Sequence, residues 1–247
     1  MSEPAAPRRP FLTNAAIALL CAALGGVGGW WWEAHRTGGA ERAEVERIVH
    51  DYLLAHPEVL PEAMAVLEKR QNASQLSGVR GEVEKAAAGT VLGNPQGKVT
   101  LVEFTDYACG YCRRSVEDVD RLIAANPDLR VVVRELPILS PGSADAAKMA
   151  IAAAEQGRYA EFHRAMFASG NPDERTIAAA AAAAGLDLER ARKVVAAPAT
   201  EAELVRNMDL AKRLGFTGTP SWVVGEAMLS GAVGEDQLAR AIADSRS

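Results

Sequence analysis

The chain has few cysteines and few aromatic residues, and it has no excess of positive charge. Three cysteines among 247 residues exclude a small scaffold held together by disulfides. Aromatic residues make up only 5% of the chain. The formal net charge is −5 and no nucleic-acid-binding footprint is visible, so we expect no nucleic-acid partner. What is present is a hydrophobic content of 49%, enough for one domain with a sizeable core and appendages.

Two of the cysteines form the motif Cys109-Gly110-Tyr111-Cys112. The preceding run, 98–104, has apolar residues on both faces of the pleat, which is typical of an interior strand. Helical spacing follows Asp106, so we expect Cys109 in the first turn of a helix, where free N–H groups and the helix dipole favour a thiolate. Cys112 comes one turn later, within disulfide range. The motif predicts a redox-active dithiol with Cys109 exposed and reactive and Cys112 shielded.

Other interpretations of the dithiol can be compared by residue type. Structural zinc needs four ligands and there is no second cysteine pair, while covalent haem attachment needs His where Arg113 stands. An inert structural disulfide and a two-coordinate Cu(I) site both stay open as alternatives. We favour the redox-active dithiol and expect no cofactor and no resident metal.

Glu103 is the single acidic residue in the apolar run before the motif. It lies six residues before Cys109 and should therefore sit beneath the thiols. A carboxyl in low dielectric has a raised pKa and can exchange a proton with a cysteine. The alternative is an ion pair with a buried Arg or Lys. We favour the proton-exchange role.

A second stretch places Pro220 immediately before the apolar run 221–224, as is allowed at the first residue of a strand. The order of strand, Cys-x-x-Cys helix, helical insertion, Thr-Pro and hairpin resembles the thioredoxin fold. The string Glu-Phe-x-Asp-Tyr-x-Cys-x-Tyr-Cys, beginning at Glu103, resembles the DsbA family, and the resemblance covers roughly 93–243.

The resemblance implies that the Thr219–Pro220 bond is cis, faces the dithiol and contacts the substrate backbone. It also implies that Glu103, Cys109 and Cys112 are the catalytic residues. Gly110 and Tyr111 join Thr219 and Pro220 as expected substrate-binding residues. Gly110 and Tyr111 stand where strongly oxidising members have Pro-His, so a His⁺ that would stabilise the thiolate is missing.

The segment 11–32 contains no charge and is long enough to cross a bilayer core. Arg8 and Arg9 precede it, so the positive-inside rule keeps 1–10 in the cytoplasm. We therefore expect a signal anchor in the inner membrane, single-pass, with the catalytic domain in the periplasm. A cleaved signal peptide with small residues near Ala23 is the alternative.

Residues 33–92 are expected to form a linker, with glycines at 38 and 39, and an oligomerisation segment. Apolar stripes at helical spacing predict one helix over 43–54 and another over 57–71. Such helices need a partner surface, either their own catalytic domain or further copies of the chain. The string Asp-Tyr-Leu-Leu-Ala-His-Pro-Glu-Val-Leu, from Asp51, resembles the ScsC proteins, a DsbA-family branch with trimeric members that isomerise disulfides. The resemblance implies a homo-oligomer, a trimer, through 43–71.

The rest of the chain, 93–247, is expected to be an α/β thioredoxin-like domain with a helical insertion at about 143–215. The expected elements are a strand at 129–136, helices at 143–156, 159–169, 173–184, 188–196 and 201–214, a hairpin at 223–231 and a helix at 235–243. His163 has aromatic neighbours in sequence and is expected to be a core or groove residue.

These observations predict an exported thiol–disulfide oxidoreductase that acts on cysteine-containing proteins and is recycled by a membrane redox partner. A disulfide isomerase in an oligomer is favoured over a monomeric disulfide oxidase. A copper-binding dithiol protein and a membrane-tethered scaffold with a vestigial motif are the competing classes.

Overall fold

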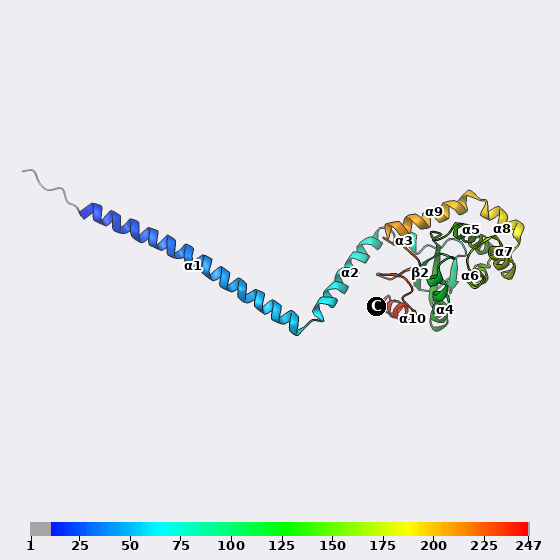
Figure 1. Cartoon of the computed structure of the whole chain (residues 1–247), viewed down its shortest axis with the longest axis horizontal. Helices are drawn as coiled ribbons and strands as arrows, with labels where there is room; N and C mark the ends of the chain where they lie inside the picture. Colours follow the sequence, from blue (N-terminus) through cyan, green and yellow to red (C-terminus); the bar gives the residue numbers. More distant parts are fainter. Residues whose placement is uncertain (1–10, 247) are drawn as a thin grey trace, which may run out of the picture. The chain divides into compact units, whose positions relative to one another are not determined.

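The computed structural model describes residues 11–246, with side chains described for 17–33 and 41–246. The chain divides into two compact units, one up to Ala65 and one from Val66 onward. Figure 1 shows the elements of both units along the chain. The expected cytoplasmic segment, 1–10, lies outside the described residues.

The first unit is helical. Helix α1 spans Phe11–Ala55, and α2, which begins in this unit, spans Val59–Ser77. The break between them falls close to the predicted one at 55–56. A linker was expected around 38–39, but α1 runs through these glycines. It does so although each glycine costs about 1 kcal/mol in a helix relative to Ala. The apolar side chains at Val45, Ile48, Val49 and Tyr52 are each more than half exposed.

The expected inner-membrane anchor with its single pass is corrected by the structure, and the periplasmic position of the catalytic domain, which was argued from that anchor, loses this argument. Among the described residues, no helix combines the length and the apolar character that crossing a membrane requires. A span takes about 20 predominantly apolar residues. The side chains described in this stretch, 17–33, are interrupted by four glycines, which add no apolar side chain, and the stretch ends at Glu33. A count of uncharged residues does not register that glycines lower the apolar character of the segment.

The second unit is built on a mixed five-stranded sheet in the order β1-β3-β2-β4-β5. Only β2 and β3 are parallel, and the other neighbouring pairs are antiparallel. Central β2 has β3 on one side and β4 on the other, which confirms it as an interior strand. The strands are β1 (Val91–Gly93), β2 (Val99–Thr105), β3 (Leu129–Glu135), β4 (Ser221–Val224) and β5 (Ala227–Ser230).

The two faces of the sheet bury different sets of residues, because successive side chains of a strand point to opposite faces. Leu101, Val131 and Val133 belong to the larger core cluster, which contains both cysteines of the motif. Val102 and Phe104 belong to a second cluster, which also takes in the end of α2 and the short helix α3 (Arg80–Val83). The odd-numbered residues of β2 and β3 therefore face the dithiol.

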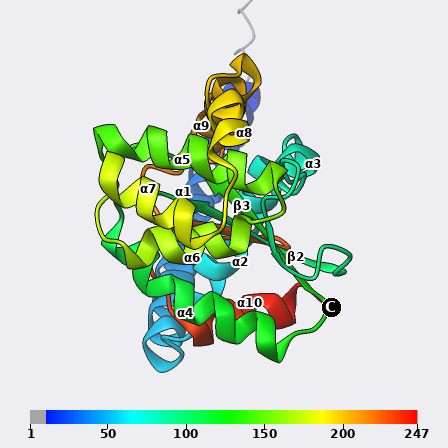
Figure 2. The ribbon, with the colours of Figure 1, turned by 90° about the vertical axis from the view of Figure 1, so that its right-hand side faces the viewer.

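The remaining helices cover the sheet and form the insertion between β3 and β4. Figure 2 shows α5, α6 and α7 packed together, and α4 beside α10. The bounds are α4 (Gly110–Ala125), α5 (Pro141–Glu155), α6 (Tyr159–Ala168), α7 (Glu174–Ala183), α8 (Leu188–Val195), α9 (Pro198–Arg213) and α10 (Glu235–Asp244). The predicted sequence of elements from 99 to 243 is confirmed, within a few residues at each boundary.

Candidate active site

Cys109 is the N-cap residue of α4, one position before the first helical turn in which it was expected. Its Sγ accepts a hydrogen bond from the backbone N–H of Cys112, with a distance of 3.3 Å between Sγ and N. The first N–H groups of a helix have no partner within the helix, so a sulfur at this place meets free donors and the positive end of the helix dipole. This is the environment that makes a cysteine a nucleophile.

Asp106 fixes the loop that carries Cys109, a role that the sequence analysis did not assign to it. Its side chain is 1% exposed. One carboxylate oxygen accepts from the N–H of Ala108 at 2.8 Å and from the hydroxyl of Ser143 at 2.6 Å. The other accepts from the N–H groups of Ile138 and Leu139, both at 2.8 Å. The signal was available, because an Asp directly after a buried strand often bonds backbone N–H groups nearby.

The Thr219–Pro220 peptide bond is cis, as the resemblance implied. In the thiol form, Cys109 Sγ donates to the carbonyl oxygen of Thr219 at 3.2 Å. Residues 110 positions apart in sequence therefore meet at the dithiol. This contact also corrects the expectation that Cys109 is exposed: Cys109 is 4% exposed and Cys112 is 0% exposed. The loop before β4 covers the nucleophile, a packing effect that local sequence does not reveal.

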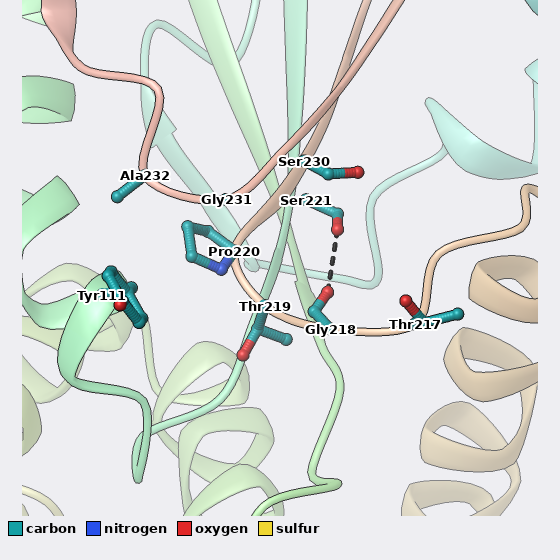
Figure 3. A pocket seen from close by; sticks show the side chains of 9 residues that line it. All are labelled: Tyr111, Thr217, Gly218, Thr219, Pro220, Ser221, Ser230, Gly231 and Ala232. Carbon is teal, nitrogen blue, oxygen red and sulfur yellow. Dashed lines mark hydrogen bonds between the residues drawn. The ribbon is translucent and has the colours of Figure 1, made fainter.

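A cavity of about 250 Å³ opens beside this contact. It includes Tyr111, Thr219 and Pro220, three of the four expected substrate-binding residues. Gly110 does not line it, but a Cβ built at Gly110 would meet nothing within 4 Å, so the space above this residue is open. Figure 3 shows the full lining: Tyr111, Thr217, Gly218, Thr219, Pro220, Ser221, Ser230, Gly231 and Ala232.

The two thiols differ strongly in acidity. Hydrogen bonding from Cys112 is the main cause that lowers the pKa of Cys109 to about 5, and Thr219 and backbone N–H groups add to it against the opposing effect of burial. Burial is the main cause that raises the pKa of Cys112 well above its ordinary value, followed by its hydrogen bond to Cys109 and the charge of Glu103. At neutral pH the negative charge therefore resides on Cys109 and the proton on Cys112.

Glu103 lies on β2, on the sheet face that carries the dithiol, and is 3% exposed. Burial first, then the charges of Glu135 and Cys109, raise its pKa to about 8. Within residues 17–33 and 41–246, no Lys or Arg is among the groups that act on its pKa, so the ion-pair alternative has no support there. A carboxyl with this pKa is a stronger base than an ordinary one and is suited to exchange a proton with a thiol.

A group of buried polar residues next to the dithiol was not identified from the sequence as a unit. Glu135 accepts hydrogen bonds at one oxygen from Tyr107 at 3.0 Å and Tyr159 at 2.8 Å. The Tyr107 hydroxyl also lies 3.2 Å from Nδ1 of His163, which is buried, as expected for a core residue. The available signal was the lone acid at the end of the apolar run 129–136, the same pattern that identified Glu103.

The described residues contain no group of three or more His, Cys, Asp or Glu side chains placed to hold a metal ion. The expectations of no metal and no cofactor stay predictions.

The matches to known proteins cover most of the chain. Residues 100–243 match the family model of the DSBA-like thioredoxin domain, and residues 41–73 match that of the copper resistance protein ScsC N-terminal domain. A thioredoxin-like oxidoreductase from Silicibacter pomeroyi DSS-3 is 43% identical, with a TM-score of 0.65. The match covers 68% of this chain and 97% of that one.

ScsC from Proteus mirabilis, in a transitional conformation, is 27% identical with a TM-score of 0.63, over 84% of this chain and 97% of that one. A curated relative, the Na(+)/H(+) antiporter NhaA 3 of Salinispora tropica, is 31% identical over 157 residues, or 62% of this chain. The match spans only 24% of that relative's own length.

Proposed function

The chain belongs to the family of DSBA-like thioredoxin domains, and from this premise we propose that it is a thiol–disulfide oxidoreductase acting on cysteines of other proteins. One observation carries the proposal. The Cys109 sulfur sits at the start of α4, beside the Thr219 carbonyl, with its pKa lowered to about 5 while Cys112 keeps its proton. This is the charge distribution that a nucleophile and a resolving thiol require.

The reaction begins when the Cys109 thiolate attacks one sulfur of a substrate disulfide. A Cys109–substrate disulfide forms, the substrate's own S–S bond breaks, and the departing sulfur leaves as a thiolate that takes a proton from water. In the second step Cys112 gives its proton to the carboxylate of Glu103 and attacks Cys109 Sγ. The Cys109–Cys112 disulfide forms and the second substrate sulfur leaves. The reverse sequence transfers the protein's disulfide to a dithiol substrate.

The substrate chain is proposed to lie along the cavity, against the backbone at Thr219 and Pro220. Tyr111 is 58% exposed and offers an apolar ring at the edge of the cavity. The open space above Gly110 leaves room for a polypeptide to approach Cys109. These contacts recognise a backbone and a sulfur, so they suit many cysteine-containing proteins.

The direction of the reaction is proposed to be disulfide isomerisation. A stabilised Cys109 thiolate favours the reduced form of the protein, and an isomerase must maintain this form. The same preference makes an oxidase a good disulfide donor, so it does not distinguish the two directions. The pKa of Cys109 is lowered to about 5 even though no His⁺ lies between the cysteines. What favours isomerisation is the segment 43–71, because several dithiols facing one substrate act at high effective concentration. A redox partner that keeps the dithiol reduced completes the proposal.

The segment 43–71 is proposed to assemble the chain into a trimer. Val45, Ile48, Val49 and Tyr52 repeat at helical spacing and are each more than half exposed, so this apolar stripe is open to a partner surface. The match of residues 41–73 to the ScsC N-terminal family model supports the assignment.

Reactivation of scrambled ribonuclease by the full chain tests the activity. Cys109→Ser should abolish reactivation, and Cys112→Ser should accumulate a mixed disulfide with substrate. An active Cys109→Ser variant would refute the assigned nucleophile.

Light scattering tests the assembly. Val49→Glu should dissociate the oligomer and reduce reactivation, while His50→Glu, on the opposite side of α1, should do neither. A monomeric wild-type chain with full reactivation would refute the oligomeric isomerase and leave an oxidase.

A further inference from the structure

We propose that Glu135 is a positioning residue for the thiol–disulfide reaction: it holds the negative charge of a buried carboxyl pair and so keeps the transferable proton on Glu103, beneath the dithiol. The inference rests on the proposed exchange function of Cys109 and Cys112. It assigns to Glu135 no contact with substrate, only an effect exerted through Glu103.

The backbone places the two carboxyls together. In the parallel pairing of β2 with β3, Thr105 is opposite Glu135 and Glu103 is opposite Val133. Glu103 and Glu135 therefore lie two positions apart on adjacent strands and on the same face of the sheet, the face that also carries the dithiol. Glu103 is 3% exposed and Glu135 is 1% exposed, so water screens neither charge.

Hydrogen bonds make the two sites unequal. Glu135 accepts from two phenol groups, those of Tyr107 and Tyr159, and each stabilises the carboxylate. For Glu103, by contrast, the Thr105 hydroxyl favours the charged form only as the last of the named causes, after three that raise the pKa. When one charge is shared between two buried carboxyls, it therefore prefers Glu135, and the proton prefers Glu103.

Charged neighbours act on both carboxyls: the Cys109 thiolate raises the pKa of Glu103 and favours the proton there, and Asp106 raises the pKa of Glu135 and opposes the charge there. Burial lowers the pKa of His163 to about 4, so this residue is neutral at pH 7 and supplies no cation. With burial as the first cause, both carboxyls have pKa values of about 8, so the pair is largely protonated at neutral pH and its first negative charge appears as the pH rises towards 8.

The consequence concerns the resolving step. Cys112 must lose its proton before it attacks Cys109, and the acceptor is the fraction of Glu103 that is ionised, which holds the proton once the transfer is complete. The charge on Glu135 raises the proton affinity of that carboxylate, so the transfer from Cys112 becomes less unfavourable. In the reverse step, Glu103 returns the proton to the Cys112 thiolate as the internal disulfide opens. Glu135 keeps its charge in both directions.

The test compares the pH dependence of mixed-disulfide resolution in the full-length wild type, Glu103→Gln and Glu135→Gln. Glu135→Gln should move the pH limb that depends on Glu103 down by about one pH unit, because it removes a like charge beside that carboxyl. Glu103→Gln should lose this limb. The infrared C=O band of the protonated carboxyl, identified by its loss in Glu103→Gln, should shift its titration midpoint in the same direction.

Tyr159→Phe provides a second variant that leaves both carboxyls in place. Removing one phenol donor makes the charge on Glu135 less stable, so the same limb should move down by a smaller amount. Glu155→Gln, at an exposed position on α5, is the control for the loss of one carboxyl and should leave the profile unchanged.

Two results would contradict the inference in different ways. If Glu135→Gln slows resolution equally at every pH, with the limb and the infrared midpoint unmoved, then Glu135 has only a structural role and the inference fails. If the wild type shows no thiol–disulfide exchange, the proposed function fails as well.

Discussion

Replacing Glu103 with Gln should make the reduced protein more stable near neutral pH. The folded state raises the pKa of this carboxyl from 4.5 to about 8. Between these values the folded protein binds a proton that the unfolded chain has released, so its stability falls as the pH rises. Gln has nearly the same shape and does not titrate, so the variant should lose this part of the pH dependence.

The size of this stability difference depends on how far the pH lies above the pKa of the carboxyl in the unfolded chain. Each pH unit above that pKa lowers the wild type's free energy of unfolding by about 1.4 kcal/mol. At pH 7 the variant should therefore be more stable than the wild type by at most about 3 kcal/mol. At pH 5 the same reasoning leaves a difference below about 1 kcal/mol. Glu103→Gln should therefore be nearly as stable as the wild type at pH 5 and clearly more stable at pH 7.

Urea unfolding of the reduced proteins at pH 5, 6, 7 and 8 measures this difference. Glu155→Gln, at an exposed position on α5, is a matched loss of one carboxyl and should follow the wild-type slope. A Glu103→Gln curve that runs parallel to the wild type would refute the reasoning, because it would mean that Glu103 is charged in the folded protein and stabilised by a partner.

Three further predictions concern the dithiol and its supports. Near pH 6, alkylation of the reduced protein should label Cys109 before Cys112, because the pKa of Cys109 is lowered to about 5 and that of Cys112 is raised; preferential labelling of Cys112 would reverse the assignment. Thr219→Val should raise the pKa of Cys109 by about one unit, measured by thiolate absorbance, because it removes the Thr219 hydroxyl, one of the groups that lower this pKa, while the backbone carbonyl beside Cys109 Sγ remains. An unchanged pKa would leave this stabilisation to Cys112 and the backbone. Asp106→Ala should lower the free energy of unfolding by about 3 kcal/mol, because three backbone N–H groups and one hydroxyl lose their acceptor. A loss below about 1 kcal/mol would show that water replaces the carboxylate.

Much of the catalytic unit could be predicted because its signals are local. The apolar run before the motif became β2, and the run 221–224 became β4 with the predicted bounds. Glu103 stood out because a charge in such a run needs a reason to be buried. Glu135 is also an acid in an apolar run, but no cysteine follows it at short range, so the sequence around it does not indicate a redox role.

What could not be predicted depends on contacts between distant segments. The three-residue strand β1 is too short to show a periodic pattern, and it is defined by its pairing with β3. The burial of Cys109 depends on a loop 110 residues later in the chain. The hydrogen bonds from Tyr107 and Tyr159 to Glu135 join a loop, a helix and a strand that only the folded chain brings together.

The carboxylate of Asp106 joins the dithiol loop, the loop after β3 and the first turn of α5. Ser143, in the first turn of α5, therefore links the inserted helices to the loop that carries Cys109. Substitutions in α8, which contributes no residue to the core cluster that contains both cysteines, should leave the thiols in place, whereas changes at 140–143 should disturb the loop that carries them. A short joint at 140–143 thus ties the placement of the insertion to the geometry of the thiol site.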